Sequence, residues 1–203
     1  MKFKFKIQQY QTDAVENTVS VFTGQPSHRV AEYRRDLGKR SQQQIDFEGE
    51  TGFRNHHIEL DGRTLLKNIN AIQNLYDITP SATLSKGVGA VNLDIEMETG
   101  TGKTYVYIKT MFELNKQYGW SKFIIVVPSI AIREGVAKSF KMLEEHFMEY
   151  YGKKARWFIY NSSNPQQLDS FSSDSGLSVR IIKTQAFAAS MKEGGKSKES
   201  RII

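Results

Sequence analysis

The 203-residue sequence contains no cysteine and no long hydrophobic run. The lack of cysteine excludes disulfide bonds and thiolate metal sites, and it agrees with the reducing cytoplasm, where we expect the protein to be. No apolar stretch approaches the roughly 20 residues that cross a bilayer, so we expect no membrane association of that kind. No internal repeat is visible, which excludes solenoids and propellers.

Basic residues outnumber acidic ones. The sequence has 28 Lys and Arg against 22 Asp and Glu, a formal net charge of +6, and its pI is near 9.4. This balance favours a polyanionic partner such as nucleic acid. Charge alone does not decide the question, because many proteins carry this much charge for solubility.

The N-terminal part of the chain combines two predicted helices with a long irregular stretch. Apolar residues recur at helical spacing over residues 11–22 and again over 64–73. Residues 24–62 are polar, charged and without a sustained period, which indicates a mobile insertion or a partly ordered excursion. We expect three segments, namely an N-terminal helix with a Tyr-Gln element (1–23), a variable insertion with a helix (24–90) and a nucleotide-binding core (91–203).

The remainder alternates predicted strands and helices. The pattern predicts a strand over 91–97, a helix over 103–118, a strand over 122–128, a helix capped by Ser129 and ended by Gly152, and strands over 155–160 and 179–183. The continuous apolar run KFIIVVP is typical of a strand buried on both faces. The order predicts an α/β fold with a mostly parallel sheet, flanking helices and right-handed crossovers.

Residues 97–104 match the phosphate-loop pattern G-x-x-x-x-G-K-[ST] except at the first position, where Met97 replaces glycine. A predicted strand precedes the loop and a predicted helix follows it, so backbone N–H groups can converge on phosphate oxygens. Lys103 would reach the β and γ phosphates, and the Thr104 hydroxyl would bind Mg²⁺. The predicted nucleotide-binding residues of the loop are Thr99, Gly100, Thr101, Gly102, Lys103 and Thr104.

Met97 followed by E-T-G-T-G-K-T resembles motif I of superfamily-two helicases, in which the first glycine is often absent. Small-molecule kinases fit less well, since their full loop usually lies close to the N-terminus. The segment from Leu93 to Val136 resembles the Res subunit of type III restriction enzymes, and so do an early Tyr-Gln pair, the helix LLKNINAIQ and the stretch IIKTQAF. The resemblance implies a RecA-like P-loop NTPase domain that uses ATP and Mg²⁺.

The resemblance also implies roles for residues outside the loop. Gln11, beside Tyr10, would recognise adenine, because an amide can donate to N7 and accept from the N6 amino group together. Two motifs would contact the phosphates and sugars of a DNA strand through Pro128, Ser129, Arg133, Thr184 and Gln185. For the first of these motifs, a helix cap with a solvated arginine remains the alternative reading.

Hydrolysis of ATP by such motors needs an Asp-Glu pair at the end of a strand, and the sequence offers none. Glu144, Glu145 and His146 resemble such a box but fall inside a predicted helix, so we interpret them as a solvated helix face. His56 and His57 do not indicate a metal site, since adjacent side chains diverge and no third ligand stands at ligand spacing. We therefore expect a truncated front end that lacks the Asp-Glu box and the arginine finger.

Two functional readings follow. In the first, the chain belongs to an ATP-dependent restriction endonuclease with a helicase-type motor that acts on double-stranded DNA together with a Mod methyltransferase partner. In the second, the isolated chain is a module that binds ATP or DNA without turnover. A motor domain of another superfamily-two helicase, from type I restriction or from repair, is a further alternative.

Overall fold

The computed structural model describes residues 5–28, 31–34, 51–85, 91–161 and 166–192. The chain forms two compact units, one built from residues 1–29 and 56–119 and the other from residues 30–55 and 120–203. Among the described helices, none combines the length and the apolar character that a bilayer crossing requires. The predicted division of the chain at residues 23 and 90 stays a prediction.

The first unit contains three described helices, α1 (Gln9–Ser20), α2 (Gly62–Leu75) and α3 (Lys103–Tyr118). Helices α1 and α3 pack against each other, and Val15 and Val19 of α1 are buried at i, i+4 spacing on one helix face. The Tyr118 hydroxyl donates to the Val19 carbonyl at 3.2 Å, which links the ends of the two helices. The helices predicted over 11–22, 64–73 and 103–118 are confirmed.

The strand predicted over residues 91–97 is wrong. The structure shows no strand between Val91 and Glu98, and Ile95 is 49% exposed. Alternation of apolar and polar residues shows which side chains share a face, but a strand also needs a neighbour that completes its backbone hydrogen bonds. Among the described residues, no strand pairs with this segment.

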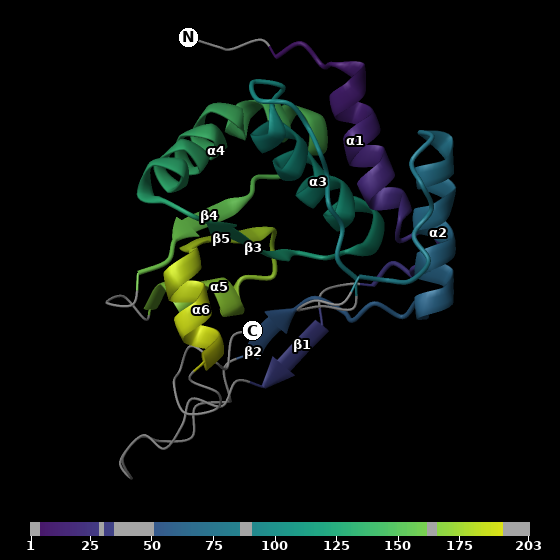
Figure 1. Cartoon of the computed structure of the whole chain (residues 1–203). Helices are drawn as coiled ribbons and strands as arrows, with labels where there is room; N and C mark the ends of the chain where they lie inside the picture. Colours follow the sequence, from purple (N-terminus) through teal and green to yellow (C-terminus); the bar gives the residue numbers. More distant parts are fainter. Residues whose placement is uncertain (1–4, 29–30, 35–50, 86–90, 162–165, 193–203) are drawn as a thin grey trace. The chain divides into compact units, whose positions relative to one another are not determined.

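The second unit contains a three-stranded parallel sheet with the order β3-β5-β4. Its elements are β3 (Lys122–Val127), α4 (Ile130–Tyr151), β4 (Arg156–Ile159), α5 (Gln166–Ser173), β5 (Ser178–Lys183) and α6 (Thr184–Lys192). The connection through α4 runs from β3 past β5 to β4, and the connection through α5 runs back from β4 to β5. Right-handed crossovers therefore place the two helices on opposite faces, as Figure 1 shows. The predicted parallel sheet is confirmed.

The fully buried strand of this sheet is β5, not β3. Val179, Ile181 and Ile182 of β5 are almost inaccessible, whereas Val126 of β3 is 41% exposed. The expectation that β3 is buried on both faces is wrong, because β3 lies at an edge of the described sheet. The burial of the central strand β5 was not predicted, because Arg180 interrupts its apolar sequence. The Arg180 guanidinium lies over the Phe171 and Tyr160 rings.

Helix α4 begins and ends where the sequence predicts. The Ser129 hydroxyl accepts a hydrogen bond from the Ile132 N–H at 3.3 Å, and the helix ends at Gly152. The apolar stripe of α4 is buried. Glu144, Glu145 and His146 lie within this helix, and Glu144 pairs with Lys154 at 2.5 Å. Their interpretation as a helix face is confirmed.

Several elements fall in stretches that were predicted to be irregular. An antiparallel pair, β1 (Ala31–Arg34) and β2 (Thr51–Arg54), lies inside the predicted insertion. Helix α5 lies in a polar stretch that was read as a loop, and only Phe171 and Ser172 of that helix are buried among its described side chains. The Gly, Lys and Ser-rich stretch from residue 193 onward lies outside the described residues.

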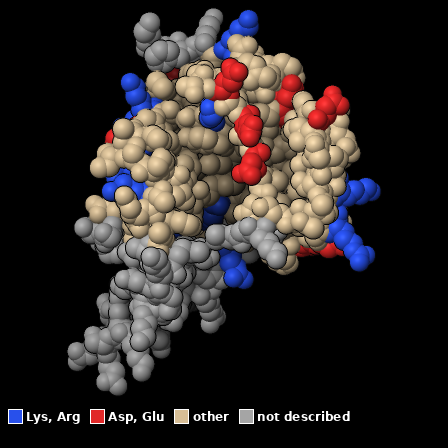
Figure 2. All heavy atoms as spheres, viewed as in Figure 1, with Lys and Arg blue, Asp and Glu red and all other residues tan. Residues whose placement is uncertain are grey.

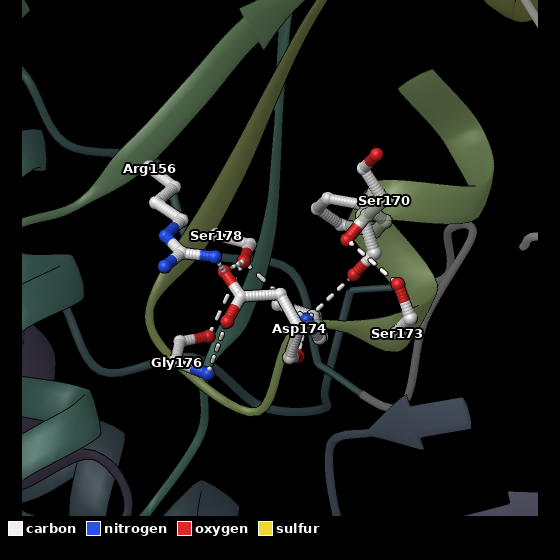
Figure 3. Close-up of polar contacts among 8 residues, drawn as sticks. Arg156, Ser170, Ser173, Asp174, Gly176 and Ser178 are labelled. Atoms are coloured by element: carbon white, nitrogen blue, oxygen red, sulfur yellow. Dashed lines mark hydrogen bonds and ion pairs between the residues drawn. The ribbon is translucent and has the colours of Figure 1, made fainter. Parts of the chain in front are cut away.

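A polar cluster holds the turn that leads from α5 into β5, at the amino end of the sheet (Figure 3). The Asp174 carboxylate accepts hydrogen bonds from the Gly176 N–H at 2.9 Å and the Ser178 hydroxyl at 2.8 Å. Arg156 of β4 lies 3.5 Å from the same carboxylate. Burial alone would raise the pKa of Asp174, but these two hydrogen bonds and the nearby cations outweigh burial and lower it.

Lys122, the first residue of β3, adds a second cation to this amino-end cluster. Its ammonium donates to the Phe171 carbonyl at 2.6 Å and also to the Asp174 carbonyl. Burial lowers the pKa of Lys122 to about 8, and the Asp174 carboxylate opposes this shift. The cations at the amino end of the sheet are therefore used to hold the chain's own turn.

Candidate nucleotide site and nucleic-acid interface

The predicted phosphate loop leads directly into α3. Gly100 and Gly102 have φ angles of 84° and 89°, a left-handed conformation that favours glycine. Gly102 is the N-cap residue of α3, and no side chain caps the helix there. The first N–H groups of a helix have no partner within it, so the start of α3 can bind an anion.

The loop is closed by one backbone carbonyl. The Glu98 oxygen accepts from the Thr101 hydroxyl at 2.6 Å and from the Lys103 ammonium at 2.9 Å. The exposed Lys103 thus lies on the loop rather than away from it, and Thr104 is half-buried in the first turn of α3. The Lys103 ammonium is exposed, and its one described hydrogen bond is to the Glu98 carbonyl.

An open hollow of about 490 Å³ adjoins the loop. Lys103 lines it together with Met97 and residues of the preceding segment, Ile95, Glu96 and Glu98. The two carboxylates are exposed. Negative charge at this position disfavours a bare triphosphate, so a polyphosphate would bind here more readily with a divalent cation.

Gln11 lies against the phosphate loop although 90 positions separate it from Thr101. Its amide donates to the Thr101 carbonyl at 2.9 Å, and the Tyr10 hydroxyl donates to the same oxygen at 3.1 Å. A Cβ atom added to Gly102 would lie 2.5 Å from the Gln11 amide nitrogen. The packing of α1 on α3 brings these residues together, and the contact of Tyr10 was not foreseen from the sequence.

The predicted DNA-contacting residues gather at the carboxyl ends of the parallel strands. Pro128 and Ser129 follow β3, and Thr184 and Gln185 follow β5, its neighbour in the sheet. The Thr184 hydroxyl donates to the Val127 carbonyl at 3.2 Å, so the two predicted motifs lie side by side. In open α/β sheets, ligands bind at the carboxyl ends of the strands.

A hollow of about 560 Å³ opens at the carboxyl ends of the strands. It is lined by Arg133, Ile159, Tyr160, Asn161, Gln167, Lys183 and Ala186. Arg133 pairs with the exposed Glu134 at 2.8 Å. Within the described residues, the Lys183 ammonium has neither an ion pair nor a hydrogen bond. Lys183 and Asn161 were not among the predicted site residues, although each stands at or just after the end of a predicted strand.

Among the described residues, basic side chains stand in several separate groups on the face that Figure 2 shows. The net charge of +6 therefore does not by itself mark a binding surface there. Local geometry, such as the edge that carries Arg133 and Lys183, is a better guide to an anion-binding site than the overall charge.

A glycine loop before an uncapped helix and a parallel sheet flanked by helices are both features of α/β proteins of the P-loop class. Comparison with known sequences identifies the particular family. The model of the family described as "Type III restriction enzyme, res subunit" matches residues 4–202, so the chain belongs to this family. The predicted fold class and the predicted resemblance are confirmed.

Three curated relatives share this assignment. The Res subunits of the type III restriction-modification enzymes EcoP15I of Escherichia coli and EcoPI of Escherichia phage P1 are each 38% identical over 110 residues, covering 53% of the chain and 11% of the relative. The StyLTI Res subunit of Salmonella typhimurium is 51% identical over 63 residues, covering 30% of the chain and 6% of the relative. The chain thus spans about a tenth of the length of the first two relatives.

Proposed function

We propose that the chain is the ATP-binding and DNA-contacting part of the motor of a type III restriction endonuclease. The observation that carries this proposal is the loop before α3, where two left-handed glycines leave the helix start uncapped and Lys103 lies on the loop. The intact protein would couple ATP hydrolysis to movement or switching on double-stranded DNA. It would cleave DNA together with a Mod methyltransferase partner.

The first turn of α3 would hold the phosphates of ATP. Backbone N–H groups from Gly102 to Thr104 would donate to phosphate oxygens, and Lys103 would exchange the Glu98 carbonyl for the β and γ phosphates. Thr104 would bind Mg²⁺ through its hydroxyl. The bound Mg²⁺ would neutralise phosphate charge beside Glu96 and Glu98, which fits the acidic lining of the hollow.

Gln11 would recognise the adenine base. Its amide nitrogen donates to Thr101 of the loop, and its amide oxygen can accept from the N6 amino group of adenine. Guanine presents a carbonyl oxygen at that position, which an amide oxygen cannot pair with. The contact between Gln11 and the loop supports this role because it places the amide beside the proposed phosphate site.

The carboxyl-end edge of the sheet would contact the DNA backbone. Ser129, Arg133, Thr184 and Gln185 would contact phosphates and sugars there, and we add Lys183 because it lines the hollow at the same end of the sheet. Contacts of this kind position a duplex without reading its sequence. This matches a division of labour in which a Mod partner reads the recognition site.

The 203-residue chain would bind ATP without hydrolysing it. None of the three described parallel strands is followed by Asp or Glu, since β3 leads to Pro128, β4 to Tyr160 and β5 to Thr184. A general base and a carboxylate partner for Mg²⁺ are therefore missing from the strand ends in the described part of the chain. The proposal predicts no DNA-stimulated release of phosphate by this chain alone.

Calorimetric titration with ATP and Mg²⁺ tests the nucleotide site. Lys103→Ala should weaken binding by about 10-fold to 100-fold, because a hydrogen bond to a charged group contributes about 1.5–3 kcal/mol. Lys116→Ala is the matched control, since Lys116 lies in the last turn of the same helix and its loss should leave the affinity unchanged. Unaltered binding by Lys103→Ala, with both variants folded by circular dichroism, would remove the phosphate-loop assignment.

A further inference from the structure

His28 lies beside His56 and Glu59 in the first unit, although His28 is distant from both in the sequence. One ligand atom from each of His28, His56 and Glu59 can be chosen so that all three lie within 4.8 Å of one another. The His28 Nε2 atom lies 2.6 Å from the Glu59 Oε1 atom. The imidazole rings of His28 and His56 are stacked with their centroids 4.5 Å apart. His57, which adjoins His56 in the sequence, is not part of the cluster.

The sequence indicates no metal site at His56 and His57, because adjacent side chains diverge and no third ligand stands at ligand spacing. The structure places a second histidine, His28, beside His56 instead. The chain path supplies that ligand from elsewhere, since His28 lies beside His56 and Glu59 lies three residues beyond it. The pair that matters is therefore His28 with His56.

Buried hydrogen bonds fix the two segments that carry the cluster. The side chain of Gln25 is buried, accepts from the Glu59 N–H at 2.8 Å and donates to the His57 carbonyl at 3.3 Å. The His28 N–H donates to the Tyr118 carbonyl at 3.4 Å. The backbone around all three side chains is thus held without any help from the cluster itself, which lowers the cost of ordering ligands for an ion.

The His28 Nε2 atom is a buried polar atom that lacks a hydrogen bond of standard geometry, although the Glu59 carboxylate is 2.6 Å away. After rotation of the two side chains, the nitrogen and the carboxylate can bind one ion together, because each offers a lone pair. The side chains of His28 and Glu59 are 36% and 37% exposed, so water could complete the coordination of that ion.

We propose that His28, His56 and Glu59 bind a divalent transition metal ion of the Zn²⁺ type. Two imidazole nitrogens and one carboxylate oxygen are ligands that suit Zn²⁺, whereas Mg²⁺ and Ca²⁺ prefer oxygen ligands throughout. Ligands about 2.0–2.1 Å from a tetrahedral ion lie roughly 3.3 Å apart. The His28 Nε2 and Glu59 Oε1 atoms are 2.6 Å apart, so these two side chains would rotate away from each other to admit the ion.

All three ligands belong to the first unit of the chain. The site is separate from the proposed Mg²⁺ site at Thr104 and does not depend on ATP.

Titration of the untagged 203-residue chain with ZnCl₂ in the absence of nucleotide tests the proposal, with CoCl₂ absorbance as a second readout. We expect one ion for each chain and a visible cobalt spectrum in which nitrogen ligands contribute. His28→Ala, His56→Ala and Glu59→Gln should each weaken binding by at least about 10-fold, since even outer partners of a metal site contribute 10-fold to 100-fold. Excess MgCl₂ should not displace the ion.

His57→Ala is the matched control, because it removes a neighbouring exposed histidine outside the cluster. Its Zn²⁺ affinity should equal that of the unaltered chain. Equal weakening by His57→Ala and His56→Ala would show adventitious binding to surface histidines and overturn the proposal. Failure of the folded, unaltered chain to bind Zn²⁺ or Co²⁺ would overturn it without reference to any variant.

Discussion

Both ends of the β3-β5-β4 sheet carry basic side chains, but these side chains differ in what they contact. At the amino end, the Lys122 ammonium donates to backbone carbonyls and Arg156 lies against the Asp174 carboxylate. At the carboxyl end, Lys183 has no polar partner among the described residues, and Arg133 pairs with an exposed neighbour. The same residue types stabilise a turn at one end and remain available to a ligand at the other.

The comparison shows why a basic residue cannot be assigned to DNA binding from its charge alone. A cation whose donors are already bonded inside the protein would lose those bonds when it turns toward a phosphate. At the carboxyl end, Lys183 would lose only contacts with water, and Arg133 would exchange its contact with the exposed Glu134. Substitutions at the amino end should therefore affect stability, and substitutions at the carboxyl end should affect DNA binding.

Asp174→Ala should have the largest effect on stability. It removes the acceptor of the Gly176 N–H and of the Ser178 hydroxyl and the carboxylate beside Arg156. We expect the free energy of unfolding to fall by about 1–3 kcal/mol, measured by urea denaturation. Glu145→Ala, an exposed position on α4, should change it by less than about 0.5 kcal/mol.

DNA affinity should be unaltered in any Asp174→Ala protein that remains folded. A stability equal to that of the unaltered chain would show that the amino-end cluster is not structural. A loss of DNA affinity comparable to that of Arg133→Ala would remove the distinction between the two ends of the sheet.

Arg133→Ala and Lys183→Ala should have the next largest effect, on DNA binding alone. Each should weaken binding of a short duplex about fivefold, because one such contact contributes on the order of 1 kcal/mol. Each should also reduce the slope of log affinity against log salt by about 1. Fluorescence anisotropy across a salt series measures both quantities.

Lys138→Ala provides the matched control for these two variants, since Lys138 is an exposed residue of α4. It should leave the affinity and the salt slope unchanged. If all three variants weaken binding equally, the interaction is a diffuse attraction to positive charge, and the carboxyl-end edge is not a specific interface.

The smallest expected effect is a dependence of the free energy of unfolding on pH, caused by the ionisation of Lys122. Burial lowers its pKa from 10.5 to about 8 in the folded chain, so between these values the unfolded chain binds more protons. The free energy of unfolding should then rise with pH across this window. The rise should be modest because the side chain is only half-buried.

Urea denaturation at several pH values between about 8 and 10 measures the contribution of Lys122. Lys122→Met should remove the rise, and Lys138→Met should preserve it. A rise of the same size in Lys122→Met would show that other titratable groups cause the pH dependence, and that burial does not lower the pKa of Lys122.

Much of the fold follows from local sequence patterns. Helix α4 is marked by its cap at Ser129, its apolar stripe and its end at Gly152, all of which lie within one stretch of chain. The prediction of a strand over 91–97 was wrong because a strand depends on a partner strand, whose position in the sequence no local pattern reveals. The buried strand β5 was recognised, but its central position was not, since Arg180 made it less apolar than β3.

The candidate sites also differ in how far the sequence alone predicts them. The phosphate loop is contiguous, so its residues could be predicted together. The position of Gln11 and Tyr10 against Thr101 depends on the packing of α1 and α3 and was suggested only by family resemblance. The metal-site cluster joins His28 to His56 and Glu59, and no local pattern connects His28 with that pair, so the structure alone brings them together.

Reactivity of individual lysines toward acetylation, read by mass spectrometry, tests the account most directly. Addition of ATP and Mg²⁺ should protect Lys103, addition of duplex DNA should protect Lys183, and Lys122 should respond to neither. This pattern would place nucleotide on the phosphate loop and DNA at the carboxyl ends of the strands. Protection of Lys122 by DNA while Lys183 stays reactive would contradict the assignment of the two ends of the sheet.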